Sequence, residues 1–272
     1  MANKIVSLAE MARSIPDGSS IGFGGSFLHR APFALVRELV RRGARGLEVI
    51  KSSPGYDIDL LARAHAVSRA KAGIVAIEGG LGLAPSYRRA VEDGELQLEE
   101  HSCMTIVAGM RAAAAGVPFA PVAGVFGSDL LALNHWKTVA DPYGSGKETV
   151  VVPAISPDVA VIHANEADAN GDARVYGSPH WDRELTRAAK RVFVTAERLV
   201  SSAQLAQQPE LTLLPGFMVE AVAIVPRGAW PGSLHPDYDV DYAAVEAYLE
   251  PGDAALARHL AAAPEARVFS RA

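Results

Sequence analysis

The sequence predicts an α/β protein, built on an open and mainly parallel β-sheet with helices on both faces. Short apolar runs suited to buried strands alternate with stretches whose apolar residues recur at helical spacing. The 272 residues, 49% of them hydrophobic and 21% charged, are enough to bury a full core. No internal repeat or linker-like stretch interrupts the pattern, so we expect one domain over residues 1–272.

The first elements surround a glycine-rich stretch. Residues 21–23 form a short apolar strand that leads into several glycines. A helix then starts at Pro32, which suits a first helical position, and ends at Gly43. The same alternation predicts strands at 47–53, 73–78 and 96–102, and helices at 57–66, 84–95 and 105–115.

The second half begins with a stretch of different character. Residues 116–146 are rich in glycine and proline, so we expect a long irregular excursion of the kind that carries function or an interface. The segment 149–177 then supplies two apolar strands and a polar turn, and 183–200 supplies a helix and a strand. Residues 217–229 contain the last clear strand, and the tail from about Asp241 is predicted to be helical.

Composition excludes several classes of function. The net charge of −5, without a basic run, argues against a nucleic-acid-binding surface. No apolar stretch reaches the roughly 18 residues of a membrane span, and the first residues lack the apolar core of a signal peptide. The lone Cys103 excludes an intrachain disulfide and a cysteine-based zinc site. We therefore expect a cytoplasmic protein.

Familiar phosphate and metal motifs do not fit. Phe27 stands where the dinucleotide-binding fingerprint needs a third small residue after Gly22 and Gly24. In the segment 141–148, Asp141 and Glu148 replace the first glycine and the Ser/Thr of a phosphate-binding loop. The histidines lack the spacing of metal ligands on one helix, so no metal site is predicted.

Four segments in a fixed order carry a resemblance. They are SIGFGGSFLHRAPFALVREL (20–39), GGLGLAPSYRRAVEDGELQLEEHS (79–102), VVVPAISPDVAVIHANEADANGDARVYG (150–177) and AAKRVFVTAERLV (188–200). Together they resemble the first (A or alpha) subunit of family I CoA-transferases, in the branch similar to glutaconate CoA-transferase. The resemblance covers most of residues 15–225 and implies a NagB/RpiA/CoA-transferase-like sheet.

The resemblance also implies a reaction. In this family, CoA moves from an acyl-CoA to a free carboxylic acid through a glutamate, which forms an acyl anhydride and then a glutamyl-CoA thioester. That glutamate lies on a partner, the second (B or beta) subunit. A hetero-oligomer (A2B2 or A4B4) is therefore implied, with a coenzyme A thioester as substrate and no tightly bound cofactor. The branch suggests a dicarboxylate such as glutaconate, while oxoacids and aromatic acyl groups stay open.

The glycine-rich stretch is the predicted substrate site. Exposed backbone N–H groups and a following helix N-terminus favour anions, and acyl-CoA and carboxylic acids are anionic. Ser26 can hydrogen-bond a substrate carboxylate or cap a helix, and Arg30 can pair with that carboxylate or face solvent or an interface. Phe27 suits a pocket wall or core packing. The predicted substrate-binding residues are Gly22, Gly24, Gly25, Ser26, Phe27 and Arg30.

No catalytic residue is expected on this chain, but two glutamates remain candidates. Glu78 ends a predicted strand and precedes two glycines, in a place where ligands sit in open α/β sheets, or it is merely an exposed turn or interface residue. Glu100 is the other candidate, because a related branch of ring-opening hydrolases uses an acidic group on its A-like subunit. The alternatives are therefore a CoA-thioester hydrolase or ring-opening subunit, or a non-catalytic acyl-CoA-binding subunit.

Overall fold

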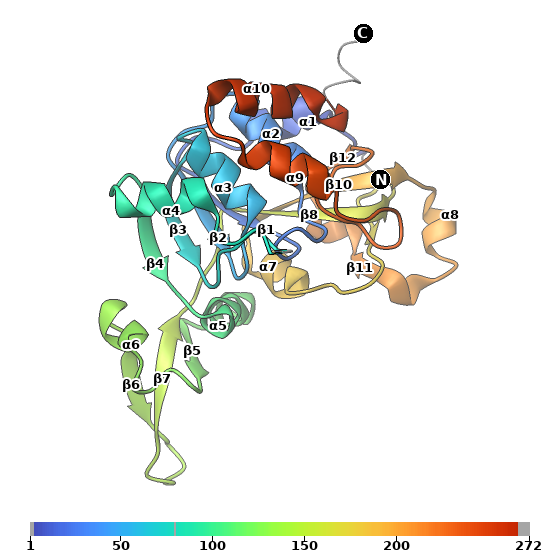
Figure 1. The fold of residues 1–272 in the computed structure, drawn as a ribbon. Helices are drawn as coiled ribbons and strands as arrows, with labels where there is room; N and C mark the ends of the chain where they lie inside the picture. Colours follow the sequence, from blue (N-terminus) through green and yellow to red (C-terminus); the bar gives the residue numbers. More distant parts are fainter. Residues whose placement is uncertain (1–2, 79, 266–272) are drawn as a thin grey trace.

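A computed structural model describes residues 3–78 and 80–265. Its main sheet confirms the predicted α/β class, because seven neighbouring strands run parallel in the order β12-β10-β8-β1-β2-β3-β4 (Figure 1). Two short antiparallel strands extend the sheet beside β8. The strands are β1 (Ser20–Phe23), β2 (Leu47–Lys51), β3 (Val67–Ala72), β4 (Gln97–Glu100), β8 (Val159–Ala167), β9 (Ala173–Arg174), β10 (Arg191–Leu199), β11 (Thr212–Leu214) and β12 (Ala221–Ile224).

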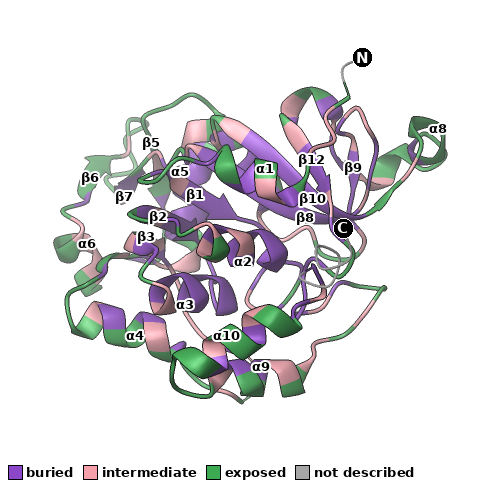
Figure 2. Cartoon of the chain, turned by 90° about the horizontal axis from the view of Figure 1, so that it is seen from above, coloured by how far each residue is buried: buried purple, intermediate pink, exposed green. Residues whose placement is uncertain are grey.

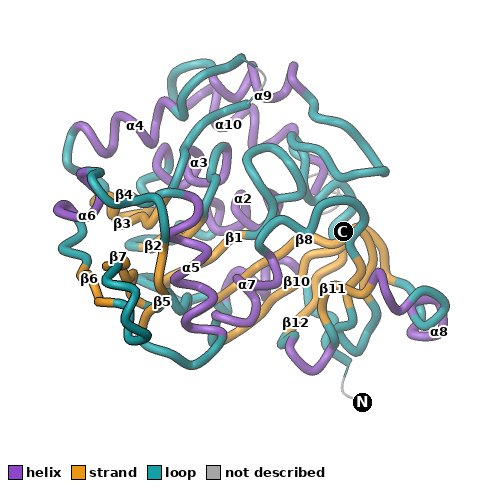
Figure 3. The backbone as a smooth tube through the Cα atoms, turned by 90° about the horizontal axis from the view of Figure 1, so that it is seen from below, coloured by secondary structure: helices purple, strands orange, loops and turns teal. Residues whose placement is uncertain are grey.

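Helices cover both faces of this sheet, as predicted, and Figures 2 and 3 show them from opposite sides. The two faces bury separate hydrophobic clusters, one centred on α2 and α3 and the other on α5 and α7. The first face carries α1 (Leu8–Arg13), α2 (Phe33–Arg41), α3 (Tyr56–Arg63), α4 (Pro85–Glu92), α9 (Tyr242–Leu249) and α10 (Asp253–Ala262). The second face carries α5 (Cys103–Ala114) and α7 (Asp182–Ala188), and α8 (Ser202–Leu205) lies at one end of the molecule.

Local sequence explains where these helices begin. Pro32 precedes α2, whose apolar residues are buried against the sheet, and Ser102 caps α5 by accepting a hydrogen bond from the Thr105 N–H. The predicted helical tail is also present, as α9 and α10. No helix in the described ranges is long and apolar enough to cross a membrane.

The prediction of a strand at residues 73–78 is wrong. The strand here is β3, residues 67–72, and the chain leaves the sheet at Gly73. A Cβ at Gly73 would lie 2.5 Å from the Ser52 carbonyl oxygen and 3.0 Å from the Cys103 nitrogen, so the chain crosses close to β2 and α5 there. The apolar Ile77 is buried against the core as part of a loop rather than a strand. Polar side chains in β3 hid it, because this strand lies near the edge of the sheet.

The excursion predicted at 116–146 also has regular structure. It holds most of a small antiparallel sheet in the order β5-β7-β6, which projects from the main body (Figure 1). Its elements are β5 (Phe119–Val122), α6 (Asp129–Leu133), β6 (Lys137–Ala140) and β7 (Glu148–Pro153). Trp136 and Val150 lie in a separate hydrophobic cluster with Ala108 of α5, which anchors this sheet. The glycines and prolines between these short strands made residues 116–146 resemble a loop in the sequence, whereas β7 coincides with the apolar strand predicted at the start of 149–177.

Candidate active site

The order of the strands singles out one crevice. From β1, the chain builds outward through β2, β3 and β4 on one side, and later through β8, β10 and β12 on the other. The two halves diverge between β1 and β8, at their carboxyl ends. In open α/β sheets, ligands bind at this switch point. The glycine loop, residues 24–30, follows β1 at that place.

The backbone of the glycine loop is held by the chain itself. The Gly24 N–H donates to the Val161 carbonyl (2.8 Å), and the Gly25 N–H donates to Asp182 Oδ1 (3.0 Å). The Ser26 N–H donates to the His29 carbonyl (2.9 Å). These three N–H groups therefore donate to partners inside the protein. None of the three is free to donate to a bound anion, which is the role predicted for the loop backbone.

The same packing explains the glycines. A Cβ at Gly24 would lie 2.8 Å from the Asp182 carboxylate, and one at Gly22 would lie 2.2 Å from Leu185 of α7. Gly25 has a φ of +71°, and its Cβ would lie 2.4 Å from the His29 carbonyl oxygen. The protein groups that approach the glycine backbone closely are therefore α7 and the returning part of the loop itself.

Arg30 forms a buried ion pair under this loop. Its side chain is 4% exposed, and its Nη1 lies 2.5 Å from Oδ2 of the fully buried Asp182. Its guanidinium also donates to the carbonyls of His163 (3.3 Å) and Ser178 (3.1 Å). The sequence predicts that Arg30 pairs with a substrate carboxylate, whereas the carboxylate beside it in the structure belongs to this chain, 152 positions away.

Glu78 reaches the site, and Glu100 does not. Glu78 Oε2 lies 2.8 Å from His29 Nε2, with side chains 32% and 47% exposed, so the loop after β3 bends back to the glycine loop. His29 Nδ1 in turn lies 2.7 Å from the Ser233 hydroxyl. Glu100 is exposed at the end of β4, three strands from β1 or roughly 14 Å at the usual strand spacing.

A cavity of about 310 Å³ opens between these groups. Its walls come from the glycine loop, the segment before α7 and the segment after β12: His29, Arg30, Tyr176, Ser178, His180, Ser233 and His235. Burial, and then the neighbouring Arg30 charge, lower the pKa of His180 to about 4, so its imidazole is neutral at pH 7. The cavity therefore offers hydroxyl groups and the neutral imidazole of His180 beside a compensated arginine.

Backbone strain gathers at the same place. Phe27, Arg30 and His180 have φ values of 45°, 55° and 48°, a left-handed conformation that is unfavourable for side chains of this size. Such residues persist where surrounding structure holds them and often mark functional sites. Two of the three line the cavity.

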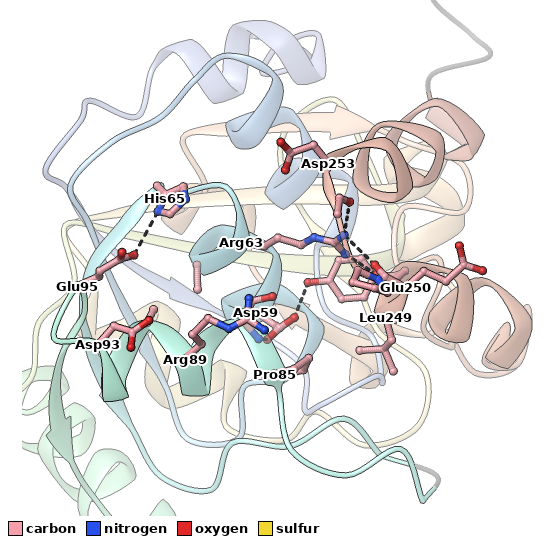
Figure 4. A pocket seen from close by; sticks show the side chains of 16 residues that line it. Asp59, Arg63, His65, Pro85, Arg89, Asp93, Glu95, Leu249, Glu250 and Asp253 are labelled. Atoms are coloured by element: carbon pink, nitrogen blue, oxygen red, sulfur yellow. Dashed lines mark hydrogen bonds and ion pairs between the residues drawn. The ribbon is translucent and has the colours of Figure 1, made fainter.

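A second cavity of about 310 Å³ lies between α3, α4 and the connection from α9 to α10 (Figure 4). Its central charges are used in holding the tail. The Arg63 guanidinium donates to the carbonyls of Tyr248, Glu250 and Gly252, and Asp59 accepts from the Tyr248 hydroxyl (2.5 Å). We interpret this cavity as structural packing of the C-terminal helices.

Sequence reasoning missed most of the residues that complete the site. Asp182, Ser178, Ser233 and His235 lie outside the four segments that carry the resemblance, and Tyr176 lies in the third of them without having been predicted as a site residue. In the described part of the chain, no group of three or more His, Cys, Asp or Glu side chains is arranged to hold a metal.

Comparison with known proteins gives the family. The coenzyme A transferase family model matches residues 5–224. The A subunit of glutaconate CoA-transferase from Acidaminococcus fermentans is 30% identical over 90% of this chain and 82% of that protein. In the crystal structure of glutaconate CoA-transferase from the same organism, a chain matches with a TM-score of 0.86 and 29% identity, over 90% of this chain and 83% of that one.

Other relatives carry different names. The cholesterol ring-cleaving hydrolase IpdA subunit of Rhodococcus jostii is 32% identical over 84% of this chain and 79% of that protein. A chain in the structure of a cysteine-to-serine variant of the decarboxylase AibA/AibB matches with a TM-score of 0.88 and 33% identity, over 99% of this chain and all of that one. A protein of Archaeoglobus fulgidus is 35% identical over 92% of this chain, which spans only 56% of that relative's length. The chain belongs to the coenzyme A transferase family, as a homologue of its A subunits.

Proposed function

We propose that this chain is the A subunit of a two-subunit enzyme that transfers CoA from an acyl-CoA to a free carboxylic acid. The second (B) subunit supplies the nucleophilic glutamate. The similarity to the A subunit of glutaconate CoA-transferase supports this reaction. The crevice at the switch point of the sheet supports the position of the substrate site.

One observation supports the assignment of the nucleophile to the second subunit. Asp182 and Glu78 of this chain contact residues that line the crevice, and both are engaged: Asp182 is buried against Arg30, and Glu78 is paired with His29. A carboxylate engaged in an ion pair or hydrogen bond is a weaker nucleophile than a free one. Asp182 is also fully buried, so a thioester cannot reach it. A glutamate from a partner is the group that completes the reaction.

Two successive substitutions at carbonyl carbons then lead to the glutamyl-CoA thioester. The partner's carboxylate attacks the thioester carbon, the CoA thiolate leaves, and an acyl–glutamyl anhydride forms. The thiolate attacks the glutamyl carbon of this anhydride, which releases the acyl carboxylate and leaves a glutamyl-CoA thioester. The acceptor carboxylate reverses both steps. This chain forms the wall with the cavity and keeps the loop at residues 24–30 rigid through Asp182.

A hydrolase is the second candidate function, because of the His29–Glu78 pair. A histidine held by a carboxylate at the rim of a crevice is a suitable general base for water. Water would then replace the carboxylic acid as acceptor. This agrees with the name of the IpdA relative, and the pair would be required for turnover.

The test uses the chain purified alone and co-purified with the product of the adjacent reading frame. Each preparation receives a panel of acyl-CoA thioesters with and without acetate, and products are followed by liquid chromatography and mass spectrometry. Transfer to acetate by the pair, with a borohydride-reducible glutamyl-CoA thioester on the partner, is the expected result. Free CoA without an acceptor would indicate hydrolysis instead, and loss of carbon dioxide would indicate decarboxylation.

Glu78→Ala separates the two candidates. In the transferase, transfer by the pair falls by no more than about tenfold, because a half-exposed ion pair contributes about 1 kcal/mol or less. Glu92→Ala, which removes an exposed ion pair with Arg88 on α4, is the matched control and leaves turnover unchanged. Turnover by the chain alone that Glu78→Ala abolishes would overturn the proposal.

A further inference from the structure

The cavity at the switch point has an unusual balance of charge. Arg30 is the one arginine or lysine among the described residues that line it. Its charge is balanced by Asp182 at 2.5 Å, and both side chains are buried. Asp182 is held in turn by the Gly25 N–H (3.0 Å). Moving Arg30 toward a ligand would leave Asp182 as a buried and uncompensated carboxylate, which is costly.

A carboxylate lies beside one of the lining residues. Glu78 Oε2 lies 2.8 Å from Nε2 of His29, and the Glu78 side chain is about one-third exposed. His180, on the opposite wall, is neutral at pH 7 because burial and the Arg30 charge lower its pKa. The remaining wall groups include the hydroxyls of Tyr176, Ser178 and Ser233, which hydrogen-bond without charge.

We propose that this cavity receives the acyl group of the substrate and selects acyl groups that carry no second carboxylate. The inference rests on the proposed function and names the substrate class of that site. A second carboxylate would lose its hydration there, and Arg30, the one arginine or lysine among the described lining residues, already has Asp182 as its partner. An alkyl acyl group would lose little, and a hydroxyl or oxo substituent would find hydrogen-bonding side chains.

The size of the cavity agrees with a small acyl group. Its volume of about 310 Å³ lies at the lower end of the range for ligand pockets, which is roughly 300–1,000 Å³. The inference departs from the dicarboxylate that the branch resemblance suggests. Specificity here follows from the charge of the site rather than from the family.

The test compares two substrates that differ only at the far end of the acyl chain. Pentanoyl-CoA and glutaryl-CoA share the thioester and five acyl carbons, and only glutaryl-CoA ends in a carboxylate. With the co-purified pair and acetate as common acceptor, kcat/KM should favour pentanoyl-CoA by about tenfold or more. Equal values, or a preference for glutaryl-CoA, would overturn the inference and leave the transferase proposal standing.

A binding measurement keeps the inference testable if the pair does not turn over. S-pentyl-CoA and S-(4-carboxybutyl)-CoA are thioethers that no carboxylate can attack, and calorimetry on the pair gives their affinities directly. Tighter binding of S-pentyl-CoA, by about tenfold, supports the charge selection even without transfer. Equal affinities, or no binding of either, mean that this cavity does not select the acyl group.

Glu78→Gln tests the cause. Removing the Glu78 charge should reduce the penalty against the carboxybutyl ligand, on the order of fivefold, because this partly exposed carboxylate lies directly beside the lining residue His29. The control Glu92→Gln removes a carboxylate from α4 and should leave the ratio of the two affinities unchanged. An unchanged ratio in Glu78→Gln would contradict the electrostatic origin of the selection.

Discussion

The Arg30–Asp182 pair makes a quantitative prediction about the stability of the glycine loop. Asp182→Asn keeps the shape of the side chain and an oxygen that can accept the Gly25 N–H, but it removes the charge. Arg30 is then left 4% exposed without a counter-ion. Breaking a buried pair in this way costs about 3–5 kcal/mol. The carbonyls of His163 and Ser178 still accept from Arg30, so we expect the lower end, about 3 kcal/mol.

Urea unfolding followed by circular dichroism measures this loss of the free energy of unfolding. For a chain of this length, the same change lowers the melting temperature by about 6–12 °C. The double variant Arg30→Met with Asp182→Asn should be more stable than the sum of the two single changes predicts, because no unpaired charge remains. Lys190→Met, which breaks an exposed pair with Asp158, is the control and should cost less than about 1 kcal/mol.

Two results would refute this reasoning. A loss in Asp182→Asn below about 1 kcal/mol would mean that the pair is solvated in solution, contrary to its burial. Additive effects in the double variant would mean that the two side chains do not depend on each other. In either case, Arg30 would be available to a ligand, and the charge selection inferred for the cavity would lose its basis.

Two further predictions concern the same fold. Gly25→Ala should lower the free energy of unfolding, measured in urea, at least twice as much as Gly43→Ala. Both glycines have φ near +70°, which costs an alanine about 1–2 kcal/mol, but only at Gly25 does a Cβ also meet backbone atoms. Equal losses in the two variants would contradict this steric explanation. His259, buried beside Trp230 and Tyr56, has a pKa lowered to about 4 by burial and then by Arg37, so the unfolded chain binds its proton first as pH falls. The stability that neutral His259 contributes is therefore present above about pH 6.5 and is lost toward pH 4, by about 3 kcal/mol. In unfolding curves at pH 7, 5.5 and 4, His259→Gln should make the free energy of unfolding depend less steeply on pH. An unchanged slope would contradict this prediction.

The sequence was most informative where structure is local. Apolar runs and capping residues predicted the parallel sheet, the helices from α2 to α5 and the helical tail. The prediction failed at 73–78, where an apolar run packs a loop against the core, and at 116–146, where short strands pair across glycine turns. In both places the outcome depends on which distant segment the residues meet, and periodicity carries no information about that.

The candidate site divides in the same way. By itself, the sequence determined the family, the glycine loop after the first strand and the position of Glu78 as a candidate site residue. Only the tertiary structure decided that α7 fills the space beside Gly22 and Gly24, and that Asp182 neutralises Arg30 from 152 residues away. Residues that carry no motif become partners because the sheet order brings β1 beside β8. The charge of the cavity is therefore a property of that juxtaposition, and no local pattern in the chain contains it.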